Sequence, residues 1–263
     1  MRNILTPKAY KIIDVRKESN LEYTFKVETD IKVEHGQFLQ LSIPKVGEAP
    51  ISVSGFGDGY LEFTIRSVGK VTDKIFTLQP GDTLFLRGSY GKGWPVEKLK
   101  GKNVIIVAGG TGVAPVRSMI NMFFNDETYT KSVNLICGFK DENSVLFKDE
   151  LALWKEKIEA IYTLDKGEKE GFENGLVTTH LAKLPFEKFG DNYEVIIVGP
   201  PMMMKFTIAE FQKIGIEDYN IWVSYERKMC CGLGKCGHCR MDTTYICTDG
   251  PVFNYAFGKT LYD

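Results

Sequence analysis

The 263-residue chain is long enough for two domains, each with its own hydrophobic core. A hydrophobic content of 43%, a net charge of −1 and scattered lysines indicate a globular protein without a basic face for nucleic acid. Neither a signal peptide nor an apolar run of the roughly 18 residues that span a membrane is visible, so we expect a cytoplasmic protein with no membrane or nucleic-acid partner.

Residues 1–99 are predicted to form an antiparallel β-barrel domain. Short apolar or alternating runs are separated by Gly- and Pro-containing turns, a spacing typical of a small barrel. Strands are expected at residues 9–15, 21–27, 37–43, 51–54, 60–65 and 83–86, and a short helix at 71–78. Within RSVGKVT, residues 66–72, Gly69 precedes that helix, so the stretch could hold phosphate or form an ordinary turn.

Residues 100–223 are predicted to form an α/β domain with a parallel sheet. The run VIIVA at 104–108 is continuously apolar, as buried parallel strands are. Strands and helices then alternate, which indicates βαβ units. Further strands are expected at 133–139, 158–164, 194–198 and 220–223, and helices at 146–157, 176–184 and 202–214, after a first helix that follows residue 115.

Two loops of this domain lie where a nucleotide is expected. GGTGVAP, residues 109–115, follows the first strand and opens a helix, and VGPPMMMKF, residues 198–206, does the same later in the chain. Backbone amides at helix N-termini bind phosphate, and ligands of such sheets bind beyond the carboxyl ends of the strands. Because GGTGVAP is not a G-x-G-x-x-G fingerprint, a plain strand–helix turn stays an alternative. The three methionines could form a soft surface near a nicotinamide, but Met202, Phe206 and Ala209 share one helix face, so core packing is expected for at least one of them.

Residues 224–263 carry a third predicted module built around cysteines. Cys231, Cys236, Cys239 and Cys247 follow the spacing C-x4-C-x2-C-x7-C, which is typical of plant-type [2Fe-2S] clusters. Intervening glycines allow the backbone to wrap around a cluster. Counting from Cys230 instead fits less well. Four thiolates also suit structural zinc, but zinc ribbons pair two C-x2-C knuckles and this chain has one, so iron–sulfur is favoured.

Taken together, these motifs resemble those of the ferredoxin–NADP reductase superfamily, in the branch with a C-terminal [2Fe-2S] module. The resemblance spans nearly the whole chain and is carried by APIS (49–52), GKVT (69–72), RGSYGKGWP (87–95), GGTGVAP (109–115), GPPMM (199–203) and CGLGKCGHC…C (231–247). The wording around the cysteines is most similar to that of the electron-transfer subunits of anaerobic sulfite reductase. The electron-transfer subunit of dihydroorotate dehydrogenase and hydrogenase gamma subunits are also similar.

The resemblance implies FAD on the barrel, NAD(P)H on the α/β domain and the cluster on the third module. The implied FAD contacts are Pro50, Ile51, Ser52, Gly69, Val71 and Thr72. The implied nucleotide contacts are Gly110, Thr111, Gly112, Gly199, Pro200 and Pro201, and the implied cluster ligands are Cys231, Cys236, Cys239 and Cys247.

The chain departs from the family pattern at the flavin strand. The superfamily usually has an arginine before the strand proline that pairs with the FAD diphosphate, whereas Glu48 and Ala49 stand here. The change is expected either to weaken FAD binding or to shift the diphosphate contact to Arg66 or Lys70. Val198 also replaces a cysteine that is common in the family beside the nicotinamide.

These features predict an oxidoreductase subunit that passes electrons from NADH through FAD and a [2Fe-2S] cluster to a partner. No acid or base residue is required, because the cofactors do the chemistry. In KDEN, after strand 133–139, Asp141 and Glu142 favour NADH over NADPH, whereas Lys140 is a cation of the kind that a 2′-phosphate needs. The expected partner is a sirohaem-containing catalytic sulfite reductase subunit, with a further iron–sulfur subunit as a candidate. Dihydroorotate dehydrogenase or hydrogenase partners, and a zinc-stabilised regulatory subunit without enzymatic activity, are the alternatives.

Overall fold

The computed structural model describes residues 5–261 of the chain. Its contacts divide the chain into two compact units, which are considered separately. The first contains residues 5–94 with Tyr225–Val252 and Leu261, and the second contains residues 95–224 with Phe253–Thr260. The cysteine segment thus shares a unit with the N-terminal strands. The division into three domains at residues 99 and 223 stays a prediction.

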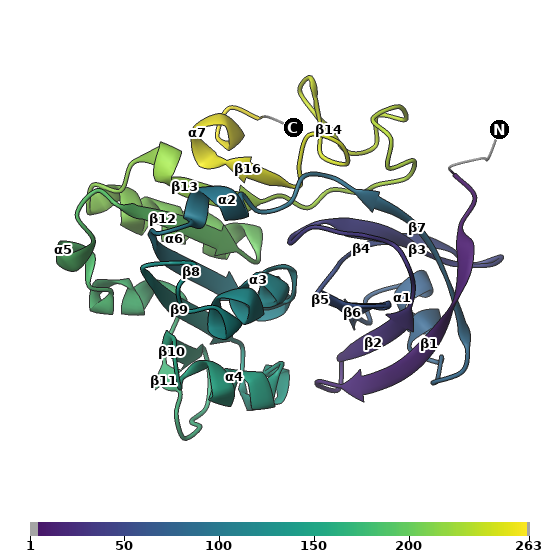
Figure 1. Cartoon of the computed structure of the whole chain (residues 1–263), viewed down its shortest axis with the longest axis horizontal. Helices are drawn as coiled ribbons and strands as arrows, with labels where there is room; N and C mark the ends of the chain where they lie inside the picture. The colour runs from purple at the N-terminus through teal and green to yellow at the C-terminus, as the bar shows by residue number, and fades with distance from the viewer. Residues whose placement is uncertain (1–4, 262–263) are drawn as a thin grey trace. The chain divides into compact units, whose positions relative to one another are not determined.

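The first unit is built on a seven-stranded antiparallel barrel sheet, as expected (Figure 1). Its strand order is β4-β3-β7-β1-β2-β6-β5. The strands are β1 (Lys8–Lys17), β2 (Glu22–Glu28), β3 (Phe38–Ile43), β4 (Gly47–Ser52), β5 (Gly55–Gly57), β6 (Tyr60–Arg66) and β7 (Thr83–Tyr90). Alternate side chains of these strands point into one apolar core that includes Phe25, Leu39 and Phe63, all without solvent exposure.

The strand expected at 51–54 is displaced, because β4 begins at Gly47 and ends at Ser52. It starts early because Lys45, with φ 65°, makes a tight turn out of β3. Pro50 is tolerated within it because β4 lies at the sheet edge, where a missing N–H does not break a ladder. The expected short helix is present as α1 (Lys70–Ile75), and Ile75 from it completes the barrel core.

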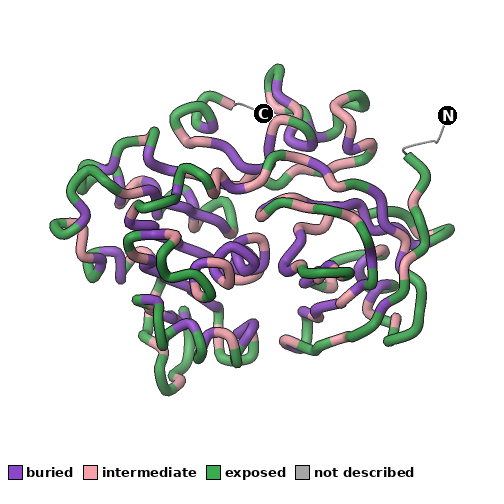
Figure 2. Tube along the Cα trace, viewed as in Figure 1, coloured by how far each residue is buried: buried purple, intermediate pink, exposed green. Residues whose placement is uncertain are grey.

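The second unit is an α/β domain with the strand order β11-β10-β9-β8-β12-β13-β16. Pairing from β11 to β13 is parallel throughout. The central strands have both faces covered, and every residue of β8 is buried (Figure 2). The strands are β8 (Asn103–Gly109), β9 (Ser132–Phe139), β10 (Glu159–Leu164), β11 (Glu173–Asn174), β12 (Tyr193–Val198), β13 (Ile221–Ser224) and β16 (Val252–Asn254).

The helices of this unit connect those strands. The α-helices are α2 (Val96–Leu99), α3 (Ala114–Asn125), α4 (Lys148–Trp154), α5 (Phe186–Phe189), α6 (Pro201–Lys213) and α7 (Tyr255–Gly258). The 3-10 helices are η1 (Gly110–Val113), η2 (Glu142–Ser144), η3 (Val177–Lys183) and η4 (Asp218–Asn220). The helix expected at 176–184 is present as η3, which is a 3-10 helix. Three consecutive β-branched residues open it and Pro185 prevents its extension, so an α-helix is disfavoured there.

Two short strands lie within the cysteine segment. β14 (Arg240–Met241) and β15 (Thr244–Tyr245) form an antiparallel hairpin whose turn includes Asp242 at φ 49°. This hairpin separates Cys239 from Cys247. Across residues 5–261, none of the helices is both long and apolar enough to cross a bilayer.

Candidate functional site

The two segments expected to bind flavin lie side by side in the first unit. Pro50, Ile51 and Ser52 are half-exposed on β4, and α1 packs beside that strand. A Cβ added to Gly47 would lie 3.2 Å from the Val71 side chain, so the strand and the helix are in direct contact. The fold therefore brings together segments that are separated by about twenty residues of sequence.

Thr72 has a structural role that the sequence does not reveal. Its hydroxyl accepts hydrogen bonds from the backbone N–H groups of Val68 (3.0 Å) and Gly69 (3.1 Å), and it donates to the Gly69 carbonyl (2.9 Å). These bonds fix the loop that enters α1. Arg66, at the end of β6, is half-exposed and lies 3.4 Å from the Glu22 carboxylate. Arg66 is thus accessible to an anion, although part of its charge is already offset.

Gln40 is a buried amide on the strand that pairs with the flavin strand. It is fully buried on β3, opposite Pro50 in the β3–β4 register and opposite Arg87 in the β3–β7 register. Neither its amide nitrogen nor its amide oxygen has a hydrogen-bond partner among the described residues. A buried amide with both groups unsatisfied is costly, which suits a site completed by a polar ligand. The residues around β4 therefore fit a bound flavin.

Ala49 and Glu48 precede the flavin-strand proline, where the family has an arginine, and Glu48 is the carboxylate of an ion pair. Glu48 accepts hydrogen bonds from Arg87 on β7, with Arg87 Nε lying 2.9 Å from Glu48 Oε1. Burial opposes ionisation of Glu48, but hydrogen bonds from Arg87 and Ser42 outweigh that effect and hold its pKa below the usual value. Glu48 is therefore committed to Arg87 and is not available as a phosphate contact.

The two nucleotide loops of the second unit are in backbone contact. A Cβ added to Gly112 would lie 2.6 Å from the Val198 carbonyl oxygen and 2.7 Å from the Gly199 Cα. Gly110 adopts φ 54° with open space above it. The structure thus places Gly110–Gly112 and Gly199–Pro201 together at the carboxyl ends of β8 and β12, which are adjacent strands. Open space above Gly110 could receive a phosphate or ring of a ligand, whereas no side chain fits where Gly112 meets Val198 and Gly199.

On the helix face expected to contribute at least one residue to the core, Met202 and Phe206 are exposed and Ala209 is half-buried. Met202 and Phe206 are 57% and 55% exposed within the described chain, whereas Met204 is buried. The Met203 thioether packs against Gly109, where an added Cβ would collide with its sulfur. α6 begins at Pro201 and turns its Met204, Ile208 and Phe211 face inward, so the alternative apolar face is left outside. The methionine run therefore serves both the core and the rim of the nucleotide loops.

The four expected cluster ligands form two contacting pairs in the first unit. The Cys236 thiol contacts the Cys231 thiol, and the Cys247 thiol contacts the Cys239 thiol. Each iron of a [2Fe-2S] cluster takes two protein ligands, so two pairs suit that donor set. Cys230 is exposed and takes part in neither pair. Among residues 5–261, no three His, Cys, Asp or Glu side chains are arranged around a single metal ion.

Backbone amides of the loop point at the sulfurs. Leu233 N–H donates to Cys231 Sγ (3.3 Å) and Gly234 N–H donates to Cys247 Sγ (3.2 Å). Amides of Cys231 and His238 lower the pKa of the Cys236 thiol to about 7, whereas burial raises the pKa of the Cys247 thiol to about 12. Such amides stabilise charge on sulfur and tune cluster potentials. The loop therefore fits an iron–sulfur cluster.

The sixth cysteine lies apart from this loop. Cys137 is fully buried in β9, and burial raises the pKa of its thiol, so it is a packing residue.

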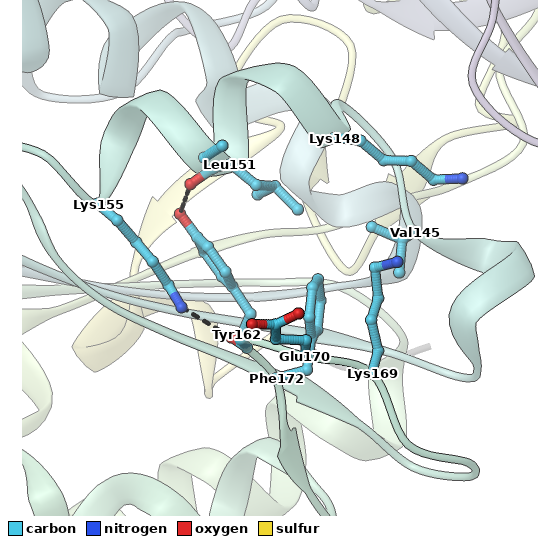
Figure 3. Close-up of a pocket in the computed structure, with 10 residues that line it drawn as sticks. Val145, Lys148, Leu151, Lys155, Tyr162, Lys169, Glu170 and Phe172 are labelled. Carbon is cyan, nitrogen blue, oxygen red and sulfur yellow. Dashed lines mark hydrogen bonds between the residues drawn. The ribbon is translucent and has the colours of Figure 1, made fainter.

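A separate hollow of about 270 Å³ lies between α4 and the 169–172 loop (Figure 3). Tyr162, whose hydroxyl donates to the Leu151 carbonyl (2.7 Å), forms part of its floor. Lys155 donates to the Gly171 carbonyl (2.7 Å). None of the residues predicted from sequence lines this hollow, which therefore lies outside the cofactor-binding loops.

Comparison with protein families matches two segments of the chain. Residues 106–208 match the oxidoreductase NAD-binding domain, and residues 226–256 match the iron–sulfur cluster binding domain of dihydroorotate dehydrogenase B. The two matches fall on the segments that contain the glycine loops and the paired cysteines. The chain accordingly has an NAD-binding domain and an iron–sulfur binding domain.

Relatives resemble the chain over almost its full length. It is 34% identical to sulfhydrogenase 2 subunit gamma of Pyrococcus furiosus over 93% of this chain and 93% of that protein. It is 32% identical to the probable dihydroorotate dehydrogenase B (NAD(+)) electron transfer subunit of Methanopyrus kandleri, over 92% and 88%.

Two solved structures share the fold. One, described as the structure of an NADH-dependent reduced ferredoxin-NADP oxidoreductase, has a TM-score of 0.80 and 25% identity, covering 96% of this chain and 89% of that one. A ferredoxin NADP+ reductase from Neisseria gonorrhoeae with bound FAD and NADP has a TM-score of 0.71 at 19% identity, covering 83% and 98%. The full-length relatives, the two matched domains and the first of these structures show that the chain belongs to the ferredoxin–NADP reductase-like family, among the electron-transfer subunits that carry a C-terminal iron–sulfur module.

Proposed function

We propose that this chain takes electrons from NADH and delivers them, through FAD and a [2Fe-2S] cluster, to a catalytic partner subunit. The observation that carries the proposal is the convergence of four thiols in two pairs, with backbone amides directed at them, in the same unit as the flavin strand. A cluster accepts one electron at a time whereas NADH gives two as a hydride, and bound FAD would supply the conversion between them.

The protein's own contribution is placement. The glycines at Gly110, Gly112 and Gly199 have no side chains, so a dinucleotide can lie directly against the backbone amide groups. Pro50 and Ser52, on the edge strand, would contact the flavin ring, and Gln40 would donate to or accept from the polar edge of that ring through its side-chain amide. Because no step needs a protein acid or base, no catalytic residue is assigned.

The choice of NADH rests on the groups after β9. Asp141 accepts a hydrogen bond from the Ser144 amide (3.0 Å) and so begins η2. Glu142 pairs with Lys169 (2.7 Å), which offsets the charge of that lysine. A 2′-phosphate needs an available cation, whereas carboxylates suit a free ribose hydroxyl. These contacts favour NADH as the donor.

A hydrogenase-type catalytic subunit is the favoured partner. The sulfhydrogenase gamma subunits of P. furiosus are 34% and 36% identical to this chain. A dihydroorotate dehydrogenase partner is the second candidate, because the cysteine segment matches the cluster-binding domain of dihydroorotate dehydrogenase B. These comparisons give no support to the sulfite reductase partner, or to the anaerobic role, expected from the sequence.

The test is an anaerobic titration of the purified chain with NADH, followed by visible absorbance and electron paramagnetic resonance. Bleaching of flavin absorbance followed by a [2Fe-2S] signal is the expected result. A colourless protein that contains zinc and no acid-labile sulfide would refute it. Hydrogen-dependent, dihydroorotate-dependent and sulfite-dependent electron transfer by the native complex would then identify the partner.

A further inference from the structure

Arg87 is a buried cation whose hydrogen bonds reach both the flavin strand and the cysteine loop. Its side chain is 4% exposed. Nε and Nη2 donate to the Glu48 carboxylate on β4 (2.9 Å and 2.5 Å), and Nη2 also donates to the Cys230 carbonyl (2.5 Å). Nη1 donates to the Tyr90 hydroxyl (2.9 Å) and to the Cys231 carbonyl (2.6 Å). All five N–H donors of the guanidinium therefore have an acceptor.

The partners of Arg87 stand next to both proposed cofactors. Glu48 lies two residues before Pro50 on the flavin strand, and Cys231 is the first proposed cluster ligand. The guanidinium donates to the Cys230 and Cys231 carbonyls, whereas the Glu48 carboxylate belongs to β4. One side chain thus joins the strand that would hold flavin to the loop that would hold the cluster.

The end of β7 fastens the same loop at two further points. A Cβ added to Gly232 would lie 3.0 Å from the Tyr90 ring, so the loop backbone packs directly on that ring. Lys92 N–H donates to the Gly250 carbonyl (2.5 Å) just beyond Cys247. Both ends of the loop are therefore tied to β7 and the residues after it, and Arg87 is the charged member of these contacts.

A buried ion pair is an expensive way to join two segments. Removing two charges from water opposes folding, and apolar residues of similar size often stabilise a protein as well or better. A role beyond stability is therefore worth testing. Cluster reduction adds negative charge, and the net charge and hydrogen bonds around a cluster set its potential. A guanidinium that contacts the ligand loop favours the reduced cluster, and Glu48 moderates that effect.

We propose that Arg87 and Glu48 form a positioning pair that holds the cluster loop against the flavin strand and sets the cluster's reduction potential. This inference rests on the proposed function only in requiring that a cluster binds. The inference gives Arg87, the first residue of RGSYGKGWP, a positioning role that the sequence motif alone did not predict. It also gives a role to Glu48, which lies next to Ala49 at the place where the family has an arginine.

The experiment measures the cluster potential of the intact purified chain by anaerobic dithionite titration, monitored by electron paramagnetic resonance. R87M removes the cation and is expected to lower the potential, changing the ratio of reduced to oxidised cluster about tenfold, or about 59 mV for one electron. E48Q leaves Arg87 unneutralised and is expected to raise the potential. Opposite shifts from the two members of one ion pair are not expected from general loosening of the fold.

Two further variants separate charge from geometry. R87K keeps the charge but loses the planar guanidinium. The ratio of reduced to oxidised cluster at a given potential should therefore stay within threefold of wild type, while amide exchange at Cys231–Leu233 accelerates at least tenfold. R16M removes an exposed arginine of the same unit, which pairs with Glu18, and should change neither quantity. If R87M assembles no cluster, E48Q decides the potential, because Glu48 is about one-third exposed.

Shifts of the same sign in R87M and E48Q, or no shift in either, would overturn the inference. Failure of NADH to reduce the wild-type flavin would instead overturn the proposed function, since the dithionite titration does not use NADH. If the wild type binds no iron, exchange in the iron-free chain still tests the positioning role. Unchanged exchange at Cys231–Leu233 in R87M would then refute it.

Discussion

Replacing Gly112 by alanine should damage the nucleotide loops without any backbone strain of its own. The new Cβ would lie 2.6 Å from the Val198 carbonyl oxygen, and real Cβ atoms almost never approach closer than 3.0 Å. The Val198–Gly199 backbone must therefore move away by about 0.4 Å or more, and no change of side-chain rotamer can relieve a contact with backbone atoms. Overpacking of this kind costs about 1–3 kcal/mol, so we expect the Tm to fall by about 2–12 °C and NADH affinity to fall at least tenfold.

Two neighbouring glycines provide matched controls. At Gly109 the clash is with the Met203 thioether, a flexible side chain that can move, so G109A should be milder and G109A/M203A milder still. At Gly110 there is open space, but φ is 54°, so G110A should lose only about 1 kcal/mol from the left-handed conformation. Thermal melts and NADH titrations of the four proteins test the order. A wild-type Tm and NADH affinity in G112A, or equal losses in G112A and G109A, would refute the backbone-contact argument.

Three other outcomes are expected. Cys236→Ser should abolish the [2Fe-2S] signal while NADH still bleaches the flavin, whereas Cys230→Ser should retain both the signal and flavin reduction. Iron and sulfide analysis with stopped-flow absorbance checks this. Loss of flavin reduction in a folded Cys236→Ser protein would contradict the order of electron transfer. Folding lowers the pKa of Glu48, so the iron-free wild type should be more stable than Glu48→Gln at pH values above the ordinary pKa near 4.5. This advantage should vanish as the pH falls through the lowered pKa, which urea unfolding at several pH values would show. A difference in stability that does not change with pH would count against the ion pair. Glu150→Ala removes the carboxylate that holds buried Arg117 and should lower the free energy of unfolding by about 2–3 kcal/mol in urea, and a loss below 0.5 kcal/mol would contradict a role for that pair.

The strand pattern and the cysteine spacing were readable from the sequence because both are local. Period-two alternation marked the barrel strands, and continuous apolar runs marked the parallel sheet. The Cys231 frame was likewise chosen over Cys230 by counting along one loop. Each of these signals lies within ten to twenty residues, so tertiary context was not needed to find it.

Two details of the helices could not be read from local patterns. The helix expected at 176–184 is of the 3-10 type, because a run of β-branched residues and Pro185 disfavour an α-helix there. The run from Met202 to Met204 offers two apolar faces to a helix, and only contact with η3 and β12 decides which one is buried. Periodicity alone ranks neither face, because it contains no information about the surface that the helix will meet.

Local patterns were enough to predict an antiparallel barrel, a parallel sheet, glycine loops after its strands and four cysteines at cluster spacing. Which distant residues share a site became visible only in the folded chain. The pairing of Glu48 with Arg87, the bonds from Arg87 to the Cys230 and Cys231 carbonyls, and the orphaned amide of Gln40 depend on strand register across 39 to 144 residues of chain. A charged residue in an apolar strand has the same letter whether it is exposed or buried, and only packing shows that this one is buried and fully hydrogen-bonded.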